Sequence, residues 1–362
     1  MRRGLFGRAD DASIESINAM KIYLRPGMAC PLTDSDLASD YDLELVAEPK
    51  QAHWIVASSI RFLAAYSLRY PFKRFLCYSN EPRHSQLMER QYRAVPMLPT
   101  IEVMNAFTGD VFWNNFHFLG SYHYDSRNNL DIDLHKPLGP LSEEGSTRRR
   151  RKTVATFFTY RPNSKPFMVD GVDRSLEAVR QTYALALNQA GLCDIYGDGW
   201  PAGISQESSG FQSAHSARLN WWTRKLQILS DYRYNLCLEN TAANYYCTEK
   251  VWHAVQAGTL PIYSSQNTTI FETFPKNSFI DVAEFHGPEE LVECLKTMSE
   301  TEYINRMNSC RETFDVCISE RKKTVANERR AHIEKLVARL RQDGNGYVRA
   351  QRVMGSPREE SA

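Results

Sequence analysis

The sequence lacks the features that would place it in a membrane or in several common enzyme classes. No apolar run approaches the roughly 20 residues needed to span a bilayer. Arg2 and Arg3 are not followed by the apolar segment of a signal peptide. The patterns GxSxG of serine hydrolases, GxxxxGK of P-loop proteins and HExxH of zinc enzymes are also absent.

Cysteine pairs and an excess of one charge are lacking as well. The eight cysteines include no CxxC pair, which is typical of reduced thiols in a cytosol. Basic and acidic residues number 44 and 43, a net charge of +1, so the composition gives no sign of a nucleic-acid partner. These features favour a cytoplasmic, bacterial-type protein, although a core separated from a membrane anchor would have the same composition.

The composition that is present, with 42% apolar and 24% charged residues, is typical of a soluble globular protein. A chain of 362 residues is too long for one ordinary core and suits two domains of roughly 150 residues. Five consecutive cations, Arg148 to Lys152, follow the polar loop LSEEGST and indicate a boundary. We therefore predict domains at 1–150 and 151–320, followed by a basic helix and a disordered tail at 321–362.

The first half has the alternating pattern of an α/β domain with a parallel sheet. Strand-like runs alternate with helical or loop stretches, and they lie at Lys21–Leu24, Leu43–Val46, Trp54–Ala57 and Phe75–Tyr78. Glu81 lies just beyond the fourth run, and Pro82 biases it away from helical geometry. From the residues alone, Glu81 is a candidate site carboxylate, and an ordinary carboxylate in a turn is the more frequent explanation.

The second half contains a strand–helix–strand unit between Asp231 and Tyr263. Tyr234–Leu238 is a short apolar strand, and Thr248 is placed to cap a helix that runs to about Ala257. Gly258 ends that helix, and Thr259–Tyr263 forms a second strand. The loop between them lies at the carboxyl end of the first strand, where parallel α/β sheets bind ligands.

Lys250 falls in the first turn of this helix, where backbone N–H groups already supply positive charge. A cation is unfavourable there unless an anion binds, and phosphate is the common solution. Glu249 would repel a phosphate and is better suited to a hydroxyl-bearing neighbour. The alternative is that Glu249 and Lys250 form a solvated surface pair, and dipole arguments leave both interpretations open.

Two other patterns are weak. GDGWPA, from Gly197 to Ala202, fits the dinucleotide fingerprint GxGxxA, but Pro201 and Gly203 interrupt the helix that should follow. Asp34-Ser35-Asp36 and Asp131-Ile132-Asp133 look like DxD metal motifs, which arise by chance in acidic loops. His117 and His123 are six residues apart and are assigned no metal.

The C-terminal segment Arg321–Arg352 has ten basic and three acidic residues. Its apolar residues form one stripe, made of Val325, Ile333, Leu336, Val337 and Leu340. One interpretation is a helix lying on an anionic membrane, so that the protein is peripheral to the inner membrane. The other, which we favour, is a terminal helix packed across the N-terminal domain with a solvated basic face.

Three segments together resemble the donor-binding part of the family 10 α-1,3/1,4-fucosyltransferases. They read LENT, YYCTEKVWHAVQAGTLPIY and FPKNSFIDVAEF, and they lie within about fifty residues between Tyr232 and Phe285. The resemblance implies an α/β fold of the GT-B type, in which two Rossmann-like domains face each other across a cleft. The N-terminal domain would bind the acceptor and the C-terminal domain the GDP-sugar.

The resemblance also implies roles for individual residues. Members of this family carry a catalytic base at the strand end that Glu81 matches. VRQTYALAL resembles the family segment whose arginine reaches the donor diphosphate, which assigns that role to Arg180 together with Lys250. The family's remaining donor contacts fall on Asn240, Tyr246 and Glu249.

The implied activity is the inverting transfer of L-fucose from GDP-β-L-fucose to a hydroxyl of an oligosaccharide or polysaccharide acceptor. The linkage would be α-1,3 or α-1,4, to an acceptor that contains N-acetylglucosamine. No cofactor would be required, with a divalent cation such as Mn²⁺ at most stimulatory. Ser264-Ser265-Gln266 replaces the glycine that usually follows the family's second strand, which puts the donor sugar in doubt more than the fold.

Alternatives from other classes remain open at this point. One is a GT-B glycosyltransferase that uses a different nucleotide sugar. Another is a nicotinamide-dependent enzyme acting on sugar nucleotides, which would need a true GxGxxG motif and a proton relay. The third is a non-catalytic sugar-binding module, which would need no nucleotide cleft. The aromatic stretch Phe112–Asp125 likewise suits either an acceptor platform or a buried core.

Overall fold

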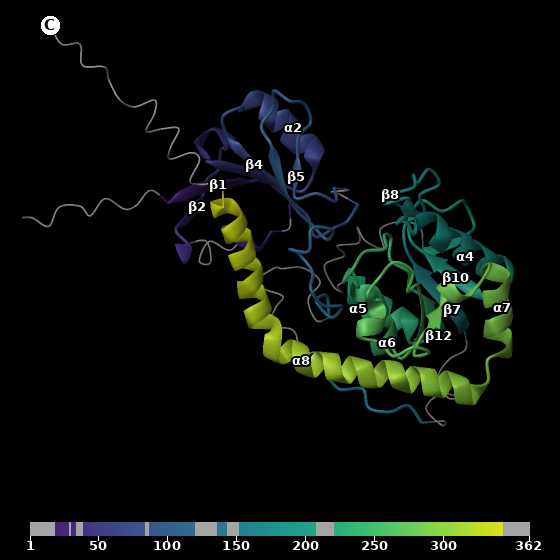
Figure 1. The fold of residues 1–362 in the computed structure, drawn as a ribbon. Helices are drawn as coiled ribbons and strands as arrows, with labels where there is room; N and C mark the ends of the chain where they lie inside the picture. Colours follow the sequence, from purple (N-terminus) through teal and green to yellow (C-terminus); the bar gives the residue numbers. More distant parts are fainter. Residues whose placement is uncertain are drawn as a thin grey trace, which may run out of the picture.

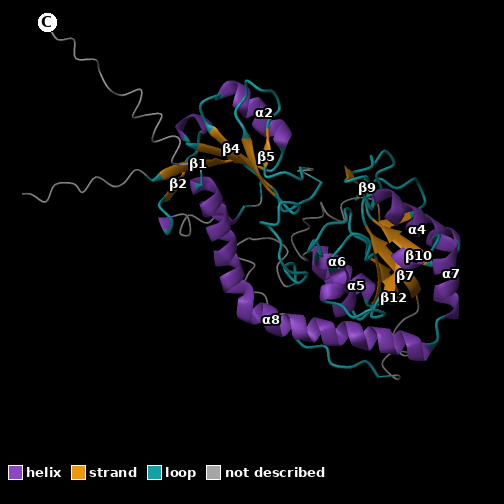
Figure 2. Ribbon diagram, in the orientation of Figure 1, coloured by secondary structure: helices purple, strands orange, loops and turns teal. Residues whose placement is uncertain are grey.

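The computed structural model describes residues 19–28, 30–33, 39–83, 87–119, 136–142, 152–207 and 221–342. Within these ranges the chain forms two separate sheets of six strands each and one small hairpin. Figures 1 and 2 show the two sheets side by side, each with its own helices. This is the predicted α/β architecture with two parallel sheets. The predicted boundary near residue 150 and both DxD triplets lie outside the described residues.

The first sheet has the strand order β2-β1-β3-β4-β6-β5. Its strands are β1 (Met20–Leu24), β2 (Leu43–Leu45), β3 (Trp54–Ala57), β4 (Arg74–Tyr78), β5 (Gln91–Tyr92) and β6 (Ile101–Met104). All neighbours pair in parallel except β5, which is antiparallel to β6. The four strands predicted in this half are confirmed, whereas β5 and β6 were not predicted.

Helix α2 (Ile60–Arg69) connects β3 to β4, and Ser59 caps it by accepting a hydrogen bond from the Arg61 N–H (3.3 Å). Its Leu63 packs on the apolar face of the first sheet. All four residues of β3 are buried, as expected for a central strand of a parallel sheet. Single turns of 3-10 helix lie at η1 (Pro31–Thr33), η2 (Pro49–Gln51), η4 (Ile270–Glu272) and η5 (Val282–Glu284).

The second sheet has the order β11-β10-β7-β12-β13-β14 and is parallel throughout. Its strands are β7 (Lys152–Phe157), β10 (Cys193–Tyr196), β11 (Ser205–Glu207), β12 (Tyr232–Leu236), β13 (Leu260–Tyr263) and β14 (Ile280–Asp281). A hairpin of β8 (Met168–Val169) and β9 (Val172–Asp173) precedes helix α4 (Glu177–Gln189). Asp173 belongs to this hairpin, and the helix begins four residues later at Glu177.

The other helices of this domain are α5 (Trp221–Leu229), α6 (Glu249–Gln256) and α7 (Pro288–Thr297). The strand–helix–strand unit predicted between Asp231 and Tyr263 is confirmed as β12, α6 and β13. Gly197 and Gly199 are not followed by a helix in the described residues up to 207. The segment GDGWPA is therefore not a dinucleotide-binding motif. A Cβ on Gly197 would lie 2.4 Å from the Phe158 carbonyl oxygen, so glycine is needed there for close approach of the backbones.

Helix α8 (Glu300–Arg341) is a single helix of 42 residues that spans both domains. Figure 1 shows it running past the second sheet and then alongside the first. The division predicted at residue 321 therefore falls inside one helix. Its early residues, such as Met307 and Phe314, join the core of the second domain.

The last turns of α8 complete the core of the first domain. Ile333, Leu336, Val337 and Leu340 are buried against residues of β1, β3 and β4. This confirms the packed terminal helix, and these side chains are not available to a membrane. The proposed membrane contact through this apolar stripe is therefore wrong. No helix within the described ranges has the length and apolarity needed to cross a bilayer.

Candidate functional site

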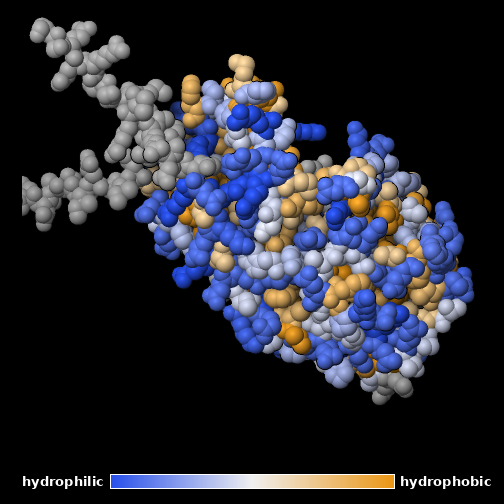
Figure 3. Space-filling model, in the orientation of Figure 1, coloured by the Kyte–Doolittle hydropathy of each residue, from blue (hydrophilic) through white to orange (hydrophobic). Residues whose placement is uncertain are grey.

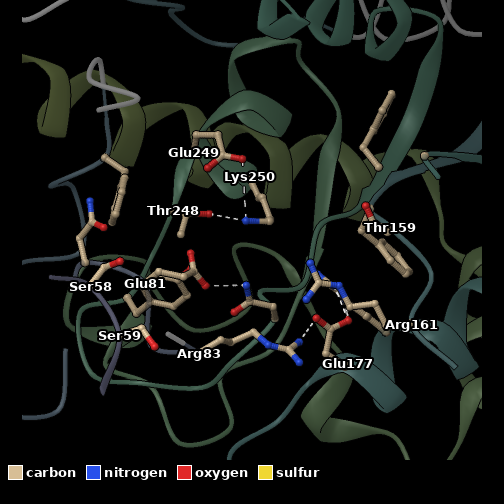
Figure 4. A pocket seen from close by; sticks show the side chains of 18 of the residues that line it. Ser58, Ser59, Glu81, Arg83, Thr159, Arg161, Glu177, Thr248, Glu249 and Lys250 are labelled. Carbon is tan, nitrogen blue, oxygen red and sulfur yellow. Dashed lines mark hydrogen bonds and ion pairs between the residues drawn. The ribbon is translucent and has the colours of Figure 1, made fainter. Parts of the chain in front are cut away.

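A cavity of about 1290 Å³ lies between the carboxyl ends of the two parallel sheets. The first domain lines it with the β3–α2 junction and the segment after β4. The second domain contributes the ends of β7 and β10 and the first turns of α4 and α6 (Figure 4). All six predicted site residues line this cavity: Glu81, Arg180, Asn240, Tyr246, Glu249 and Lys250.

Glu81 reaches the second domain from the loop after β4. Its Oε1 accepts a hydrogen bond from Asn240 Nδ2 (2.8 Å), and its Oε2 accepts one from the Tyr246 hydroxyl (2.9 Å). Within the loop, the Glu81 N–H donates to Ser79 Oγ (3.1 Å), and this hydroxyl donates to the Glu81 carbonyl (2.9 Å). The backbone of Glu81 is therefore held within the first domain, and its carboxylate is held in the cavity by two side chains of the second domain.

Tyr246 is buried among aromatic side chains of the first domain. Its ring centroid lies 5.9 Å from that of Phe112 and 6.2 Å from that of Phe118. Burial raises the pKa of the Tyr246 hydroxyl well above its ordinary value, and the neighbouring Glu81 acts in the same direction. Tyr246 is thus a neutral donor to the Glu81 carboxylate.

The same aromatic packing shows, for most of the described part of Phe112–Asp125, whether it is an acceptor platform or a buried core. Phe112 and His117 are each 2% exposed, so this part of the stretch is core. Phe118 lines the cavity. Residues 120–125, including His123, lie outside the described part of the chain.

Lys250 is paired with a buried carboxylate that the sequence analysis had not assigned to the site. Its Nζ donates to Glu239 Oε2 (2.9 Å) and to Thr248 Oγ1 (2.7 Å). Burial alone would lower the pKa of Lys250, but Glu239 and Glu249 raise it above its ordinary value. The interpretation of Glu249 and Lys250 as a solvated pair is wrong, because both side chains are largely buried.

Glu239 organises this group at the end of β12. It accepts hydrogen bonds from the Thr248 N–H (2.7 Å), the Thr248 hydroxyl (2.8 Å) and the Tyr263 hydroxyl (3.3 Å). Thr248 is at the predicted N-cap position of α6, but its side chain makes no capping hydrogen bond to the helix. The hydroxyl is instead committed to Glu239 and Lys250, which corrects the predicted cap.

Glu249 lies in the first turn of α6 as an ionised acceptor. Burial alone would raise the pKa of this carboxyl, but Lys250, Lys225 and His253 lower it to about 2. Lys225 comes from α5, is 3% exposed and places its Nζ 5.7 Å from the centroid of the Phe157 ring. Glu249 is therefore charged at every pH at which the protein would be assayed.

Two arginines pair with one buried carboxylate on the other side of the cavity, and a third, Arg161, lies close enough to both to lower their pKa values. Glu177, in the first turn of α4, accepts ion-paired hydrogen bonds from Arg180 and from Arg83 of the first domain. Figure 4 shows Arg83 pointing toward Glu177. Burial lowers the pKa of Arg180 to about 10, and the charge on Arg161 acts in the same direction. Like charges gathered around a single acid favour the binding of a further anion.

Sequence reasoning missed Arg83, Arg161, Glu177, Lys225 and Glu239. Arg161 and Glu239 follow strands β7 and β12, so the rule that sites form at the carboxyl ends of parallel strands could have found them. Arg83 lies two residues after Glu81 and could have been included with it. Lys225 and Glu177 come from helices, and no local pattern distinguishes them from ordinary surface charges.

The architecture that emerges has two Rossmann-like domains with a polar cavity between the carboxyl ends of their sheets, which is the GT-B type. The sequence model of the family described as "Glycosyltransferase family 10 (fucosyltransferase) C-term" matches residues 168–351, which is half of the chain. The chain belongs to glycosyltransferase family 10 (fucosyltransferase).

Individual relatives match over shorter segments. An α-(1,4)-fucosyltransferase of Arabidopsis thaliana is 31% identical over 86 residues, 24% of this chain and 21% of the relative. The α-(1,3)-fucosyltransferase FucT of Helicobacter pylori is 36% identical over 72 residues, 20% of this chain and 15% of the relative. The matched segments thus span about a fifth or less of the length of these curated relatives.

Solved structures align over more of the chain. A crystal structure of an α1,3-fucosyltransferase with GDP-fucose covers 83% of this chain and 85% of its own. The sequence identity is 15% and the TM-score 0.40.

Proposed function

We propose that the protein is an inverting fucosyltransferase that moves L-fucose from GDP-β-L-fucose to a hydroxyl of an acceptor glycan. The linkage formed would be α-1,3 or α-1,4, and the acceptor would contain N-acetylglucosamine. The observation that carries this proposal is the position of Glu81. Its carboxylate projects from the first domain into a cavity whose opposite wall carries the anion-binding side chains of the second domain.

The chemistry that this arrangement supports is a single in-line displacement. The acceptor oxygen forms a bond to the anomeric carbon of fucose while the bond from that carbon to the β-phosphate oxygen breaks. The acceptor proton passes to the Glu81 carboxylate, and GDP leaves with the bonding electrons. General base catalysis by a positioned carboxylate typically contributes about 10²–10⁴-fold.

The charge of the cavity fits a leaving diphosphate. Among the described residues, six basic side chains line it (Arg61, Arg83, Arg161, Arg180, Lys225 and Lys250), against four acidic ones (Glu81, Glu177, Asp198 and Glu249). A net charge of +2 in a partly enclosed site stabilises a nucleoside diphosphate as its negative charge develops. Arg180 and Lys250 are the residues we assign to the phosphates.

A donor sugar would satisfy the remaining polar groups. Asn240 Oδ1 is buried and has no hydrogen-bond partner in the described parts of the chain. A buried acceptor without a donor costs about 1–3 kcal/mol, so a sugar hydroxyl beside Asn240 would gain from this contact after a small side-chain movement. The ionised Glu249 is suited to accept from ribose or fucose hydroxyls.

The names of the matching relatives support fucose as the sugar transferred. Both relatives described above are named fucosyltransferases, and they differ in the linkage that they form. We propose that transfer needs no resident cofactor, since the basic side chains hold the diphosphate. A divalent cation such as Mn²⁺ would at most stimulate, and activity should persist in EDTA.

The direct test is incubation with GDP-fucose and a panel of glycans, followed by measurement of free GDP and of fucosylated product. Product that forms in equal amount with GDP supports the proposal. A thermal-shift comparison of GDP, UDP and CMP tests the nucleotide separately. Stabilisation by UDP or CMP and not by GDP would contradict the donor, and no stabilisation by any nucleotide would contradict the transferase mechanism.

A further inference from the structure

The first domain exposes large apolar side chains at two neighbouring loops. Phe72, in the turn before β4, is 87% exposed, and Met97, in the loop between β5 and β6, is 95% exposed. Leu68, in the last turn of α2, is 70% exposed, and Val95 is 48% exposed. Exposed apolar residues that occur singly are common, but a group of four on adjacent loops indicates a binding surface.

The sheet register places these residues at one edge of the first domain. Phe75 of β4 pairs with Ile101 of β6, and the two strands are parallel. Phe72 lies three residues before Phe75, and Met97 lies four residues before Ile101. Both therefore project beyond the amino ends of these strands. We call Leu68, Phe72, Val95 and Met97 the apolar edge.

The apolar edge is separate from the cavity. Ser58 and Glu81 follow the carboxyl ends of β3 and β4, and they line the cavity at the opposite end of the sheet. In Figure 3, apolar side chains in orange protrude among hydrophilic ones at the end of the first domain where α2 lies. A partner on this edge would leave the entrance of the cavity free.

The charges around the apolar edge have one sign. No aspartate or glutamate occurs between Pro49 and Asn80, nor between Arg90 and Ile101. Arg69, Lys73 and Arg93 flank the apolar side chains, and none of the three forms an ion pair with a described residue. Arg93 donates to a neutral partner, the Thr100 hydroxyl (3.0 Å from Nε), so its charge is not compensated. Their positive charge is therefore available to a partner at this edge.

We infer that the apolar edge docks the protein on an anionic lipid surface. Phe72 and Met97 would enter the boundary between headgroups and acyl chains, while Arg69, Lys73 and Arg93 would contact lipid phosphates. Membrane binding through a small apolar contact alone is weak and reversible. A cluster of basic residues adds electrostatic attraction to anionic lipids and so strengthens the binding. Long basic side chains also keep their charge at the headgroups while their stems cover apolar surface.

This surface differs from the C-terminal stripe, in which Ile333, Leu336, Val337 and Leu340 are buried in the first domain. The apolar edge requires no rearrangement, because its side chains are already exposed. Membrane binding at this edge also does not depend on which reaction the cavity catalyses. The inference and the proposed transferase function can therefore fail independently.

The test is co-sedimentation of the full chain with two kinds of vesicle, phosphatidylcholine alone and phosphatidylcholine with about 30% phosphatidylglycerol. We expect binding to the anionic vesicles that falls by about tenfold or more between 0.1 M and 1 M salt, because screening lengths shorten over this range. The variant Phe72→Ser/Met97→Ser should lose most binding, and so should Arg69→Gln/Lys73→Gln/Arg93→Gln.

The matched control is Met168→Ser/Val316→Ser, which removes two apolar side chains that are each 58% exposed elsewhere on the molecule. It should bind vesicles as the parent chain does. All variants should unfold at the same temperature as the parent, since they change exposed residues. Equal binding to both vesicles, no binding, or equal losses in the control and the Phe72→Ser/Met97→Ser variant would overturn the inference. Self-association that only this variant abolishes would assign the surface to a second copy instead.

Discussion

The Tyr246 hydroxyl donates a hydrogen bond of 2.9 Å to Glu81 Oε2, so a residue of the second domain orients the carboxylate of the first. Asn240 Nδ2 holds the other oxygen at 2.8 Å. Tyr246 and Asn240 belong to the loop between β12 and α6, and Lys250 follows in the first turn of that helix. The proposed base and the proposed diphosphate site are therefore connected through one segment.

This connection predicts the effect of Tyr246→Phe. The ring and its packing on Phe112 remain, but one carboxylate oxygen of Glu81 loses its donor. We expect kcat to fall by about 10–100-fold, equivalent to the loss of about 1.4–2.7 kcal/mol in the transition state, with a smaller change in GDP affinity. Steady-state kinetics and calorimetry measure the two effects.

The matched control for this variant is Tyr245→Phe. Tyr245 is the adjacent residue, and its hydroxyl contacts Glu272 outside the cavity. It should keep the parental kcat. An equal loss in both variants would mean that the loop, rather than the contact with Glu81, determines the rate.

Lys250→Ala should weaken both GDP binding and stability, for separate reasons. Affinity should fall by about tenfold or more because a phosphate contact is lost. The free energy of unfolding should fall by about 3–5 kcal/mol, because Glu239 is left as a buried charge without its cation.

The double variant Lys250→Met/Glu239→Gln separates these contributions. It removes both charges, so it should unfold at a higher denaturant concentration than Lys250→Ala and still bind GDP weakly. An unchanged dissociation constant for GDP in either variant would rule out the phosphate role of Lys250.

Two buried histidines, His332 of α8 and His117 of the first domain, predict loss of stability in mild acid. The Tyr78 hydroxyl and His332 Nε2 are hydrogen-bonded at 2.7 Å, and burial lowers the pKa of His332 well below its ordinary value, with His117 and Lys335 acting in the same direction. Burial lowers the pKa of His117 too, although Glu328 opposes the shift. Between the lowered pKa values and about 6.5, the unfolded chain binds more protons than the folded chain.

The free energy of unfolding should therefore be fully retained above pH 6.5 and should decrease below it. Each histidine contributes up to about 1.4 kcal/mol per pH unit. His332→Gln should flatten this dependence, while His286→Gln, which changes an imidazole outside both cores, should not. Denaturant unfolding at pH 7.5 and pH 5.5 gives the comparison, and equal slopes in the parent and His332→Gln would contradict the assignment.

Two glycines of the second domain should differ in their tolerance of alanine. Gly191 has a φ of +71°, and a Cβ added there would meet no atom within 4 Å, so Gly191→Ala should cost only about 1–2 kcal/mol of backbone strain. Gly197 has a φ of +128° and would also bring its Cβ to 2.4 Å from the Phe158 carbonyl oxygen. Gly197→Ala should be clearly more destabilising and should impair nucleotide binding, because Gly197 lines the cavity. Equal melting temperatures would contradict this.

Sequence patterns predicted what depends on short contiguous segments. The apolar runs of β3 and β12 and the turn after α6 at Gly258 each specify their own local structure, so these elements were found. β5 has only two residues, which is too short for a periodic pattern. The Thr248 hydroxyl donates to Glu239, nine positions away, instead of capping α6. The continuity of α8 depends on two cores that its residues contact in different domains, which local periodicity does not reveal.

The residues of the candidate site were proposed through a resemblance to a family. The charged residues that pair with them were not. Glu81, Asn240 and Tyr246 lie up to 165 positions apart in sequence, and only the packing of two domains brings them together. The pairing of Arg83 with Glu177 has the same origin. Such ion pairs between domains have no signature within either segment, whereas the motif around Lys250 is contiguous.

The most direct test of the account compares the parent chain with Glu81→Gln in single-turnover transfer from GDP-fucose, with both enzymes saturated with donor. The amide keeps the shape of the side chain and a hydrogen-bonding oxygen but cannot accept the acceptor proton. We predict unchanged folding, GDP affinity within about threefold of the parent, and a transfer rate lower by about 10²-fold or more. Transfer at the parental rate would show that Glu81 is not the base and would contradict the mechanism.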